Sequence, residues 1–137
     1  MALTHLCDSS VLTRLVKPAV RDRVRALLSR HQIVRCAIND LELGASARNG
    51  AEWDQIQADV AVFPELDIEH LDLRRALRVQ RALADAGLRG RKLPDLIVAA
   101  LAERAELVVL HYDRDFEHIG RITGQPHEWV VPVGSVD

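Results

Sequence analysis

The sequence predicts an α/β fold, a three-layer sandwich in which helices cover a mostly parallel central β-sheet. Short runs of apolar and β-branched residues alternate along the chain with segments of helical periodicity. One predicted helix, at 96–105, is nearly all apolar and must therefore be buried. The chain has 137 residues, of which 48% are hydrophobic. This is enough for one core and one compact domain spanning residues 1–137.

The first half of the chain contains two predicted strands, each followed by helical segments. Pro18 suits the first position of a helix, because its missing amide hydrogen would have no partner there. Asn39 is predicted to open the helix after the second strand. The predicted segments are, in order, a strand at 3–7, a helical turn or two at 11–16, a helix from Pro18, a strand at 33–36, a helix from Asn39 and a helical face at 53–60.

The second half continues the alternation. A long helix with a charged side is expected to turn Leu73 and Leu77 inward and to end at Gly87. Pro94 and Asp95 open the apolar helix. The predicted segments are a short extended piece at 66–68, a helix at 70–86, a basic loop at 87–92, the buried helix at 96–105, a strand at 107–110 and a last strand at 129–133.

Composition and charge exclude several classes of protein. No apolar run approaches the ~20 residues needed to span a bilayer. The N-terminus lacks the basic start and apolar core of a signal peptide, so we expect a cytoplasmic protein without membrane contact. Cys7 and Cys36 are too few for a disulfide framework or a closed zinc site, and we expect reduced core cysteines.

The charge pattern gives only weak evidence about partners. The formal net charge is −2, so the chain lacks the overall positive charge that would indicate a nucleic-acid-binding protein. All the positive side chains except Lys17 and Lys92 are arginine, which suits bidentate recognition of phosphate. Codon composition explains the same bias equally well.

Four acidic residues recur at one structural place, where a predicted strand ends or the following helix begins. Asp8 follows the first strand, and Glu42 lies in the helix after the second. Asp95 heads the buried helix, and Asp113 follows the strand at 107–110. In an open parallel sheet all strand carboxyl ends lie along one edge, where ligands bind. We therefore expect these four carboxylates to converge.

Helix capping explains each carboxylate singly, and Asn39 with Glu42 fits a capping box. Capping does not require an acid, however, because Ser, Thr or Asn serve as well. Four carboxylates crowded at one edge repel one another strongly unless a cation neutralises them. All-oxygen ligands select hard divalent ions, so the expected cofactor is Mg²⁺, with Mn²⁺ as the alternative.

Other catalytic chemistries fit the sequence less well. A Gly-rich phosphate loop is missing. Ser9 and Ser10 adjoin Asp8, but no histidine is placed locally to activate a serine nucleophile. The six histidines show no metal-binding spacing such as HExxH. His111, two residues before Asp113, is expected to be structural.

At this point the sequence resembles a known family, the PIN-domain ribonucleases, and within it the VapC-type toxins of bacterial toxin–antitoxin pairs. The order, spacing and length of the motifs agree with that family, and the likeness covers nearly the whole chain. Each motif by itself is weak, whereas the ordered set of four is fairly specific. The matching segments are LCDSSVL at 6–12, NDLEL at 39–43, PDLIVAA at 94–100 and LHYDRDF at 110–116.

The resemblance implies a set of site residues. Asp115 is a candidate fifth acid, and Ser10 matches a polar residue near the metal. His111 departs from the family, which usually has Thr or Ser there, and this puts a local hydrogen bond in question without affecting the carboxylates. The implied catalytic residues and metal ligands are Asp8, Glu42, Asp95 and Asp113.

The resemblance also implies an activity and partners. The implied activity is a Mg²⁺-dependent endoribonuclease that acts as a toxin. Metal-activated water would attack the RNA phosphorus in line, and the metal would stabilise charge on the phosphoryl oxygens. The implied partners are RNA, a second copy forming a homodimer, and a cognate antitoxin. The antitoxin would wrap an apolar groove and insert a basic side chain among the carboxylates.

A carboxylate pocket repels RNA, so other residues must hold the phosphate backbone. The loop carrying Arg89, Arg91 and Lys92 lies just before the buried helix and is the predicted RNA-binding segment. Arg14 and Lys17, shortly after the first strand, are further candidates. The alternative is that these are ordinary solvated surface charges.

Two other functions remain open on the sequence alone. The first is a Mg²⁺-dependent phosphatase-like hydrolase, but such enzymes usually place a second Asp two residues after their Asp nucleophile, and Ser10 stands there. The second is a non-catalytic RNA-binding or protein-binding module on the same fold. A cluster of carboxylates is costly to keep without a cation, which argues against that module.

Overall fold

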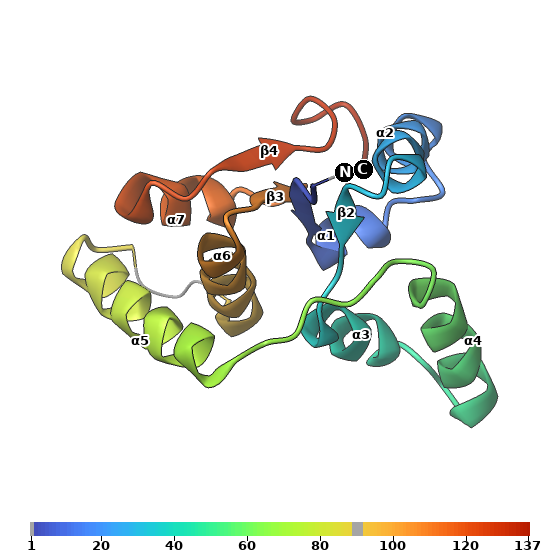
Figure 1. The fold of residues 1–137 in the computed structure, drawn as a ribbon, viewed down its shortest axis with the longest axis horizontal. Coiled ribbons are helices and arrows are strands. Elements are labelled where there is room, and N and C mark those ends of the chain that lie inside the picture. Colours follow the sequence, from blue (N-terminus) through green and yellow to red (C-terminus); the bar gives the residue numbers. More distant parts are fainter. Residues whose placement is uncertain (1, 89–91) are drawn as a thin grey trace.

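The computed structural model describes residues 2–88 and 92–137. Within them a four-stranded sheet has the order β2-β1-β3-β4, and every neighbouring pair is parallel. Figure 1 shows the strands together at the centre of the fold, with helices around them. The strands are β1 (His5–Cys7), β2 (Ile33–Val34), β3 (Val108–His111) and β4 (His127–Trp129).

Helices occupy the connections between these strands (Figure 1). Pro18 takes the first position of α2 and Gly87 follows the end of α5 with φ of 74°, both as the sequence predicts. The helices are α1 (Ser9–Leu12), α2 (Pro18–Ser29), α3 (Ala37–Gly44), α4 (Gly50–Val60), α5 (His70–Asp85), α6 (Leu93–Ala105) and α7 (Asp115–Thr123).

The two faces of the sheet are buried in separate hydrophobic clusters. Leu6 of β1 and Val109 of β3 pack with residues of α5, α6 and α7. The next residues along these strands, Cys7 and Leu110, pack on the other face with residues of α1 and α2. Because successive side chains of a strand point to opposite faces, this alternation produces three layers. The expected α/β sandwich is confirmed.

Helix α6 lies against the sheet and is mostly buried, as its apolar sequence requires. Pro94 stands in its first turn, and Asp95 follows directly. The helix ends at Ala105, and its C-cap residue Glu106 adopts a left-handed conformation with φ of 57° shortly before β3. This packing sets the start of α6, and with it Asp95, beside the carboxyl ends of β1 and β3.

Several boundaries differ from the sequence predictions. The last strand lies at His127–Trp129, earlier than expected, because these three residues pair with residues 109–111 of β3. The second strand stops at Val34, and Cys36 is instead the N-cap residue of α3. The extended piece at 66–68 forms no strand, although Glu65 makes one bridge to Arg35.

The inward face of α5 was predicted wrongly. Leu73 and Leu77 are 42% and 52% exposed, whereas Val79 and Leu83 are buried in the core. Leu73 and Leu77 instead line an apolar groove between α5 and α6. When a helix has apolar residues on more than one face, the periodicity of the sequence does not show which face packs against the sheet.

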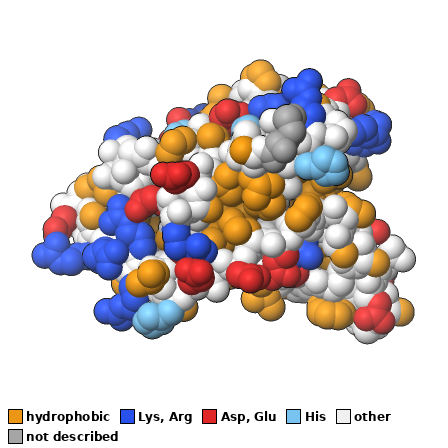
Figure 2. All heavy atoms as spheres, viewed as in Figure 1, with side chains coloured by type: hydrophobic (Ala, Val, Ile, Leu, Met, Phe, Trp, Pro, Cys, Tyr) orange, Lys and Arg blue, Asp and Glu red, His pale blue; other side chains and the backbone are white. Residues whose placement is uncertain are grey.

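The surface carries charges of both signs. Figure 2 shows hydrophobic side chains gathered near the middle of one face, between groups of acidic and basic side chains. Cys7 and Cys36 are free and buried, as predicted. In the part of the chain that the structure describes, no helix is both long and apolar enough to cross a membrane.

Candidate active site

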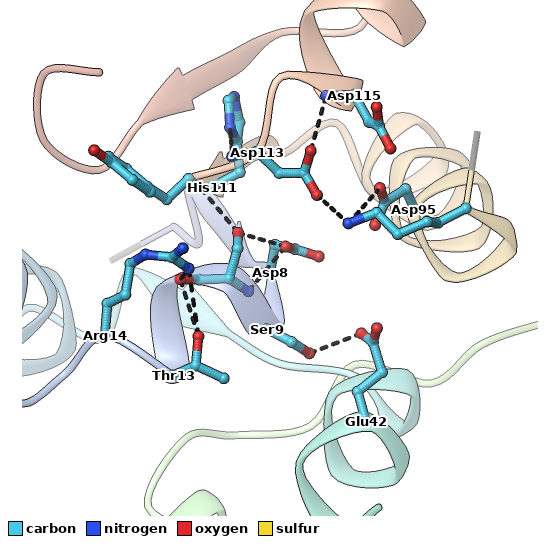
Figure 3. A network of polar contacts seen from close by, with 12 residues as sticks. Asp8, Ser9, Thr13, Arg14, Glu42, Asp95, His111, Asp113 and Asp115 are labelled. Atoms are coloured by element: carbon cyan, nitrogen blue, oxygen red, sulfur yellow. Dashed lines mark hydrogen bonds and ion pairs between the residues drawn. The ribbon is translucent and has the colours of Figure 1, made fainter. Parts of the chain in front are cut away.

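Four carboxylates that are far apart in the sequence line one cavity of about 340 Å³. Asp8 follows β1 and Asp113 follows β3, whereas Glu42 comes from α3 and Asp95 from the first turn of α6 (Figure 3). The parallel pairing of β1 with β3 brings their carboxyl ends to the same edge. The edge of the sheet therefore presents an acidic pocket.

Asp8 uses its two carboxylate oxygens differently. Oδ2 accepts hydrogen bonds from the backbone N of Ser10 at 3.0 Å and from Ser10 Oγ at 2.6 Å, which caps α1. Ser10 Oγ in turn accepts from the backbone N of Tyr112 at 2.8 Å, and so ties the segment after β1 to the segment after β3. Oδ1 is buried and has no hydrogen-bond partner among the described residues. Helix capping therefore explains the contacts of Oδ2 but not the burial of Oδ1.

Asp95 is 3% exposed, and its carboxyl is strongly perturbed by its surroundings. Its pKa is raised to about 8, chiefly by burial and also by the negative charges of Asp8 and Asp113, whereas the positive charge of Lys92 opposes the rise. Its Oδ2 is buried with no hydrogen-bond partner in the described part of the chain. Burial also raises the pKa of Asp8, against the hydrogen bonds from Ser10.

Asp113 is held by donors on both oxygens. Lys92 Nζ donates to Oδ2 at 2.5 Å, and the backbone N of Asp115 donates to Oδ1 at 2.9 Å. Burial alone would raise the pKa of Asp113, but these hydrogen bonds and the Lys92 charge leave it below its usual value. Asp113 is therefore ionised, whereas the neighbouring Asp95 is not fully so near neutral pH.

Glu42 lies on α3, but the predicted capping box with Asn39 is wrong. Helix α3 begins at Ala37, so Asn39 is inside its first turn and accepts a hydrogen bond from the backbone N of Cys36 at 2.8 Å. Asn39 Nδ2 donates to Ser9 Oγ at 3.0 Å, and Ser9 Oγ donates to Glu42 Oε1 at 2.8 Å. Glu42 is thereby linked to α1 and not to its own helix start. Burial raises its pKa, and the Ser9 hydrogen bond opposes the rise.

The residues present fit a hard divalent cation. Asp95, Asp113 and Asp115 each offer a carboxylate oxygen, and these atoms lie within 4.8 Å of one another. Oxygen donors at such separations suit Mg²⁺ or Mn²⁺. Asp8 and Glu42 line the same cavity without belonging to this close trio. The unpaired buried oxygens of Asp8 and Asp95 are the atoms that a cation would satisfy.

His111 does not line the cavity but positions the loop that carries Asp113. It is fully buried, and its Nδ1 accepts a hydrogen bond from the backbone N of Asp113 at 3.1 Å. Its Nε2 lies 2.9 Å from His127 Nδ1. Burial and, to a lesser degree, His127 lower the pKa of His111 to about 4, so the ring is neutral. This supports the expected structural role.

The predicted RNA-binding residues differ in their position relative to the cavity. Arg14 lines the cavity and donates to the backbone O of Ser10 at 2.7 Å. Lys17 lies 3.7 Å from the Asp137 carboxylate and does not line the cavity. Lys92 turns into the carboxylates instead of away from them. The predictions for Arg89 and Arg91 fall outside the described residues.

Sequence reasoning missed the residues that support the carboxylates. Asn39 and Ser9 connect Glu42 to α1, and Tyr112 lines the cavity beside Asp113. Ser9 and Tyr112 adjoin the predicted acids in sequence, which is the only signal that points to them. For Asn39 the signal was its place within the NDLEL segment, but its partner is 30 residues away.

Comparison with known proteins identifies relatives over the whole chain. The profile of the PIN domain matches residues 6–122. Ribonuclease VapC51 of Mycobacterium tuberculosis is 47% identical over 137 residues, which cover 100% of each chain. Ribonuclease VapC21 of the same species is 40% identical over 141 residues, covering 98% of this chain and 99% of the relative.

Solved structures show the same fold at lower identity. A chain of DNA-bound VapBC from Salmonella typhimurium superposes with a TM-score of 0.77 at 21% identity, covering 94% of this chain and 99% of that one. A chain of a toxin–antitoxin complex from Klebsiella pneumoniae gives a TM-score of 0.72 at 17% identity, covering 95% and 100%.

Proposed function

The chain belongs to the PIN domain family, and we propose that it is a divalent-metal-dependent endoribonuclease that acts as the toxin of a toxin–antitoxin pair. The observation that carries this proposal is the pocket in which unpaired, buried carboxylate oxygens of Asp8 and Asp95 face a common cavity with Asp113. Relatives at 47% and 40% identity are named ribonucleases. For this reason we prefer RNA hydrolysis to the phosphatase and to the non-catalytic module.

Different residues of the chain would have different roles in the site. Asp95, Asp113 and Asp115 would hold the cation, Mg²⁺ or Mn²⁺, together with the free oxygen of Asp8. When bound, such a cation acidifies a water molecule and neutralises charge that grows on the phosphoryl oxygens. Ser10 fixes the carboxylate of Asp8 with two hydrogen bonds. Preorganised ligands of this kind avoid the cost of rearrangement during the reaction.

Glu42 would act from the opposite side of the pocket. Glu42 does not belong to the close trio of Asp95, Asp113 and Asp115. Its carboxylate accepts a hydrogen bond from Ser9 Oγ at 2.8 Å. Burial raises its pKa, so it gives up a proton less readily than an exposed glutamate. It suits a residue that binds or relays a proton at the edge of the site.

RNA would be held by positive side chains around the acidic pocket. Arg14 already lies at its rim, 4.8 Å from the centre of the Tyr112 ring. Arg89 and Arg91 precede α6 in the sequence and remain proposed phosphate contacts. Single-stranded RNA binding by such contacts depends on salt because each releases counterions.

We expect the double variant Arg89→Gln/Arg91→Gln to bind single-stranded RNA more weakly and with a flatter salt dependence. Each lost phosphate contact should lower the slope of log K against log salt by about 0.7. Fluorescence anisotropy at several salt concentrations measures it. Arg21→Gln/Arg25→Gln, on the exposed side of α2, removes the same charge as a control. Equal slopes in the loop variant and the wild type would exclude the loop from the RNA site.

The proposed partners follow from the family. VapBC and other toxin–antitoxin complexes share this fold, and we propose a cognate antitoxin and a homodimer for this chain. The antitoxin would cover an apolar groove and place a basic side chain among the carboxylates. The proposed location is the cytoplasm, where RNA and a co-produced antitoxin meet.

A cleavage assay with purified protein tests the function as a whole. The protein should cut RNA with Mg²⁺ or Mn²⁺, lose that activity when EDTA removes the cation, and regain it when the cation is restored. The product of the neighbouring gene should suppress cleavage at stoichiometric concentration. Activity that persists in EDTA, or hydrolysis of phosphomonoesters without RNA cleavage, would contradict the proposal.

A further inference from the structure

A lysine of the chain itself lies among the carboxylates. Lys92 Nζ is 2.5 Å from Asp113 Oδ2 and 3.9 Å from Asp95 Oδ2. Lys92 directly precedes α6, and its backbone O accepts a hydrogen bond from the backbone N of Asp95 at 3.1 Å. The ammonium is therefore tethered to the same helix start that positions one of the acids.

This ammonium competes for the place that a divalent cation would take. A hard cation binds carboxylate oxygens at about 2.0–2.6 Å, and Asp95 and Asp113 offer oxygens within 4.8 Å of each other. A positive nitrogen at hydrogen-bond distance from one of those oxygens competes with a divalent cation for that oxygen and repels it. The ammonium uses one lone pair of Asp113 Oδ2, and its positive charge disfavours a cation bound to the same oxygen.

Withdrawal of the lysine from the pocket is feasible. Its side chain is 59% exposed, whereas that of Asp95 is 4% exposed. An ammonium that is already partly hydrated loses little on moving into water, and an exposed ion pair contributes only modestly to stability. The lysine can therefore yield to a divalent ion, while the buried acids stay in place.

We propose that Lys92 is a built-in counter-ion, which neutralises the carboxylate pocket in the metal-free protein and is displaced from Asp113 when a divalent cation binds. This inference rests on the proposed metal site. Its consequence is that Lys92 lowers the affinity for the cation. Displacement would also free a positive side chain beside the pocket, where it could contact an RNA phosphate.

Calorimetric titration of the full chain with Mn²⁺ and with Mg²⁺ tests the proposal without any activity assay. Lys92→Gln should bind the cation roughly 1.5- to 5-fold more tightly than the wild type, as expected for removal of one partly exposed ion pair. Lys17→Gln removes the same charge from the only other lysine, which pairs with Asp137 outside the cavity. Its affinity should equal that of the wild type.

Nuclear magnetic resonance of the wild-type chain gives a second test that needs no variant. With two lysines in the sequence, labelled side-chain Cε and Nζ signals are easily assigned. The Lys92 signals should shift during the Mg²⁺ titration with the same midpoint as the heat of binding, and the Lys17 signals should not. Lys92 signals that stay fixed while heat is released would overturn the proposal.

The outcomes separate this inference from the metal site on which it rests. Equal affinities for the wild type, Lys92→Gln and Lys17→Gln would refute the role of Lys92 but leave the metal site standing. Equal tightening in both lysine variants would show a general charge effect and would also refute it. Binding that Asp95→Asn leaves unchanged, or no binding at all, would refute the metal site and the inference together.

Discussion

Asp8→Asn is expected to lower the rate of RNA cleavage by at least about 10²–10³-fold with Mg²⁺ present, the usual range for loss of one preorganised electrostatic group. The asparagine carbonyl can still accept the two hydrogen bonds from Ser10 that Oδ2 accepts now. Its amide nitrogen then replaces the unpaired Oδ1. The helix cap is kept, while the negative charge and the free oxygen ligand are lost.

The measurement compares cleavage rates at saturating metal, with circular dichroism as the check on folding. Asp54→Asn on α4 is a matched control, because this exposed aspartate does not line the cavity. It removes the same charge and should leave the rate unchanged. A fully active Asp8→Asn enzyme would remove Asp8 from the site.

Asp95→Asn is expected to stabilise the metal-free protein, and increasingly so as the pH rises. The pKa of Asp95 is about 8 in the folded chain, against 3.8 as its ordinary value, chiefly because of burial. A carboxyl whose pKa is raised by folding contributes stability below the unfolded pKa and loses it as the pH rises through the folded pKa. The wild type therefore loses stability between about pH 4 and pH 8.

The size of the effect follows from the same shift. One pKa unit corresponds to about 1.4 kcal/mol, so the free energy of unfolding of the wild type should fall relative to Asp95→Asn on the order of 3 kcal/mol between pH 5 and pH 8. The lowered pKa of His111, about 4, acts in the opposite direction and cancels in this difference. Urea denaturation in EDTA at several pH values measures it.

Adding Mg²⁺ provides a control for this prediction. Saturating Mg²⁺ should restore stability to the wild type at pH 8 but not to Asp95→Asn, because ligand binding to the folded state stabilises it. A stability difference between the two proteins that does not change with pH would show that Asp95 is ionised to the same extent in the folded and unfolded chains. The burial argument for the site would then be wrong.

Local signals in the sequence predicted most of the elements. Pro18 marked the start of α2, Gly87 the end of α5, and the apolar run of α6 its burial. These predictions succeeded because each depends on the conformational limits of one residue or on one helix's own surface. The exact strand limits were less predictable, because they depend on which residues of another strand stand opposite.

The errors have one physical origin. Leu73 and Leu77 of α5 were assigned inward, and Asn39 was assigned to cap a helix with Glu42. In each case the local pattern allowed more than one partner. In the structure, Leu73 and Leu77 line a groove with residues of α6. Asn39 donates its side-chain hydrogen bond to Ser9 of α1.

By itself, the sequence determined the α/β alternation and put an acid at each of four places near strand ends, since strand and helix patterns and chain order are local properties. Only the tertiary structure decided which oxygens remain unpaired, that Asp115 joins Asp95 and Asp113, and that Lys92 turns into the pocket. These are distances between segments up to about a hundred residues apart, as between Ser10 and Tyr112. Such distances are set by how the helices pack on the sheet.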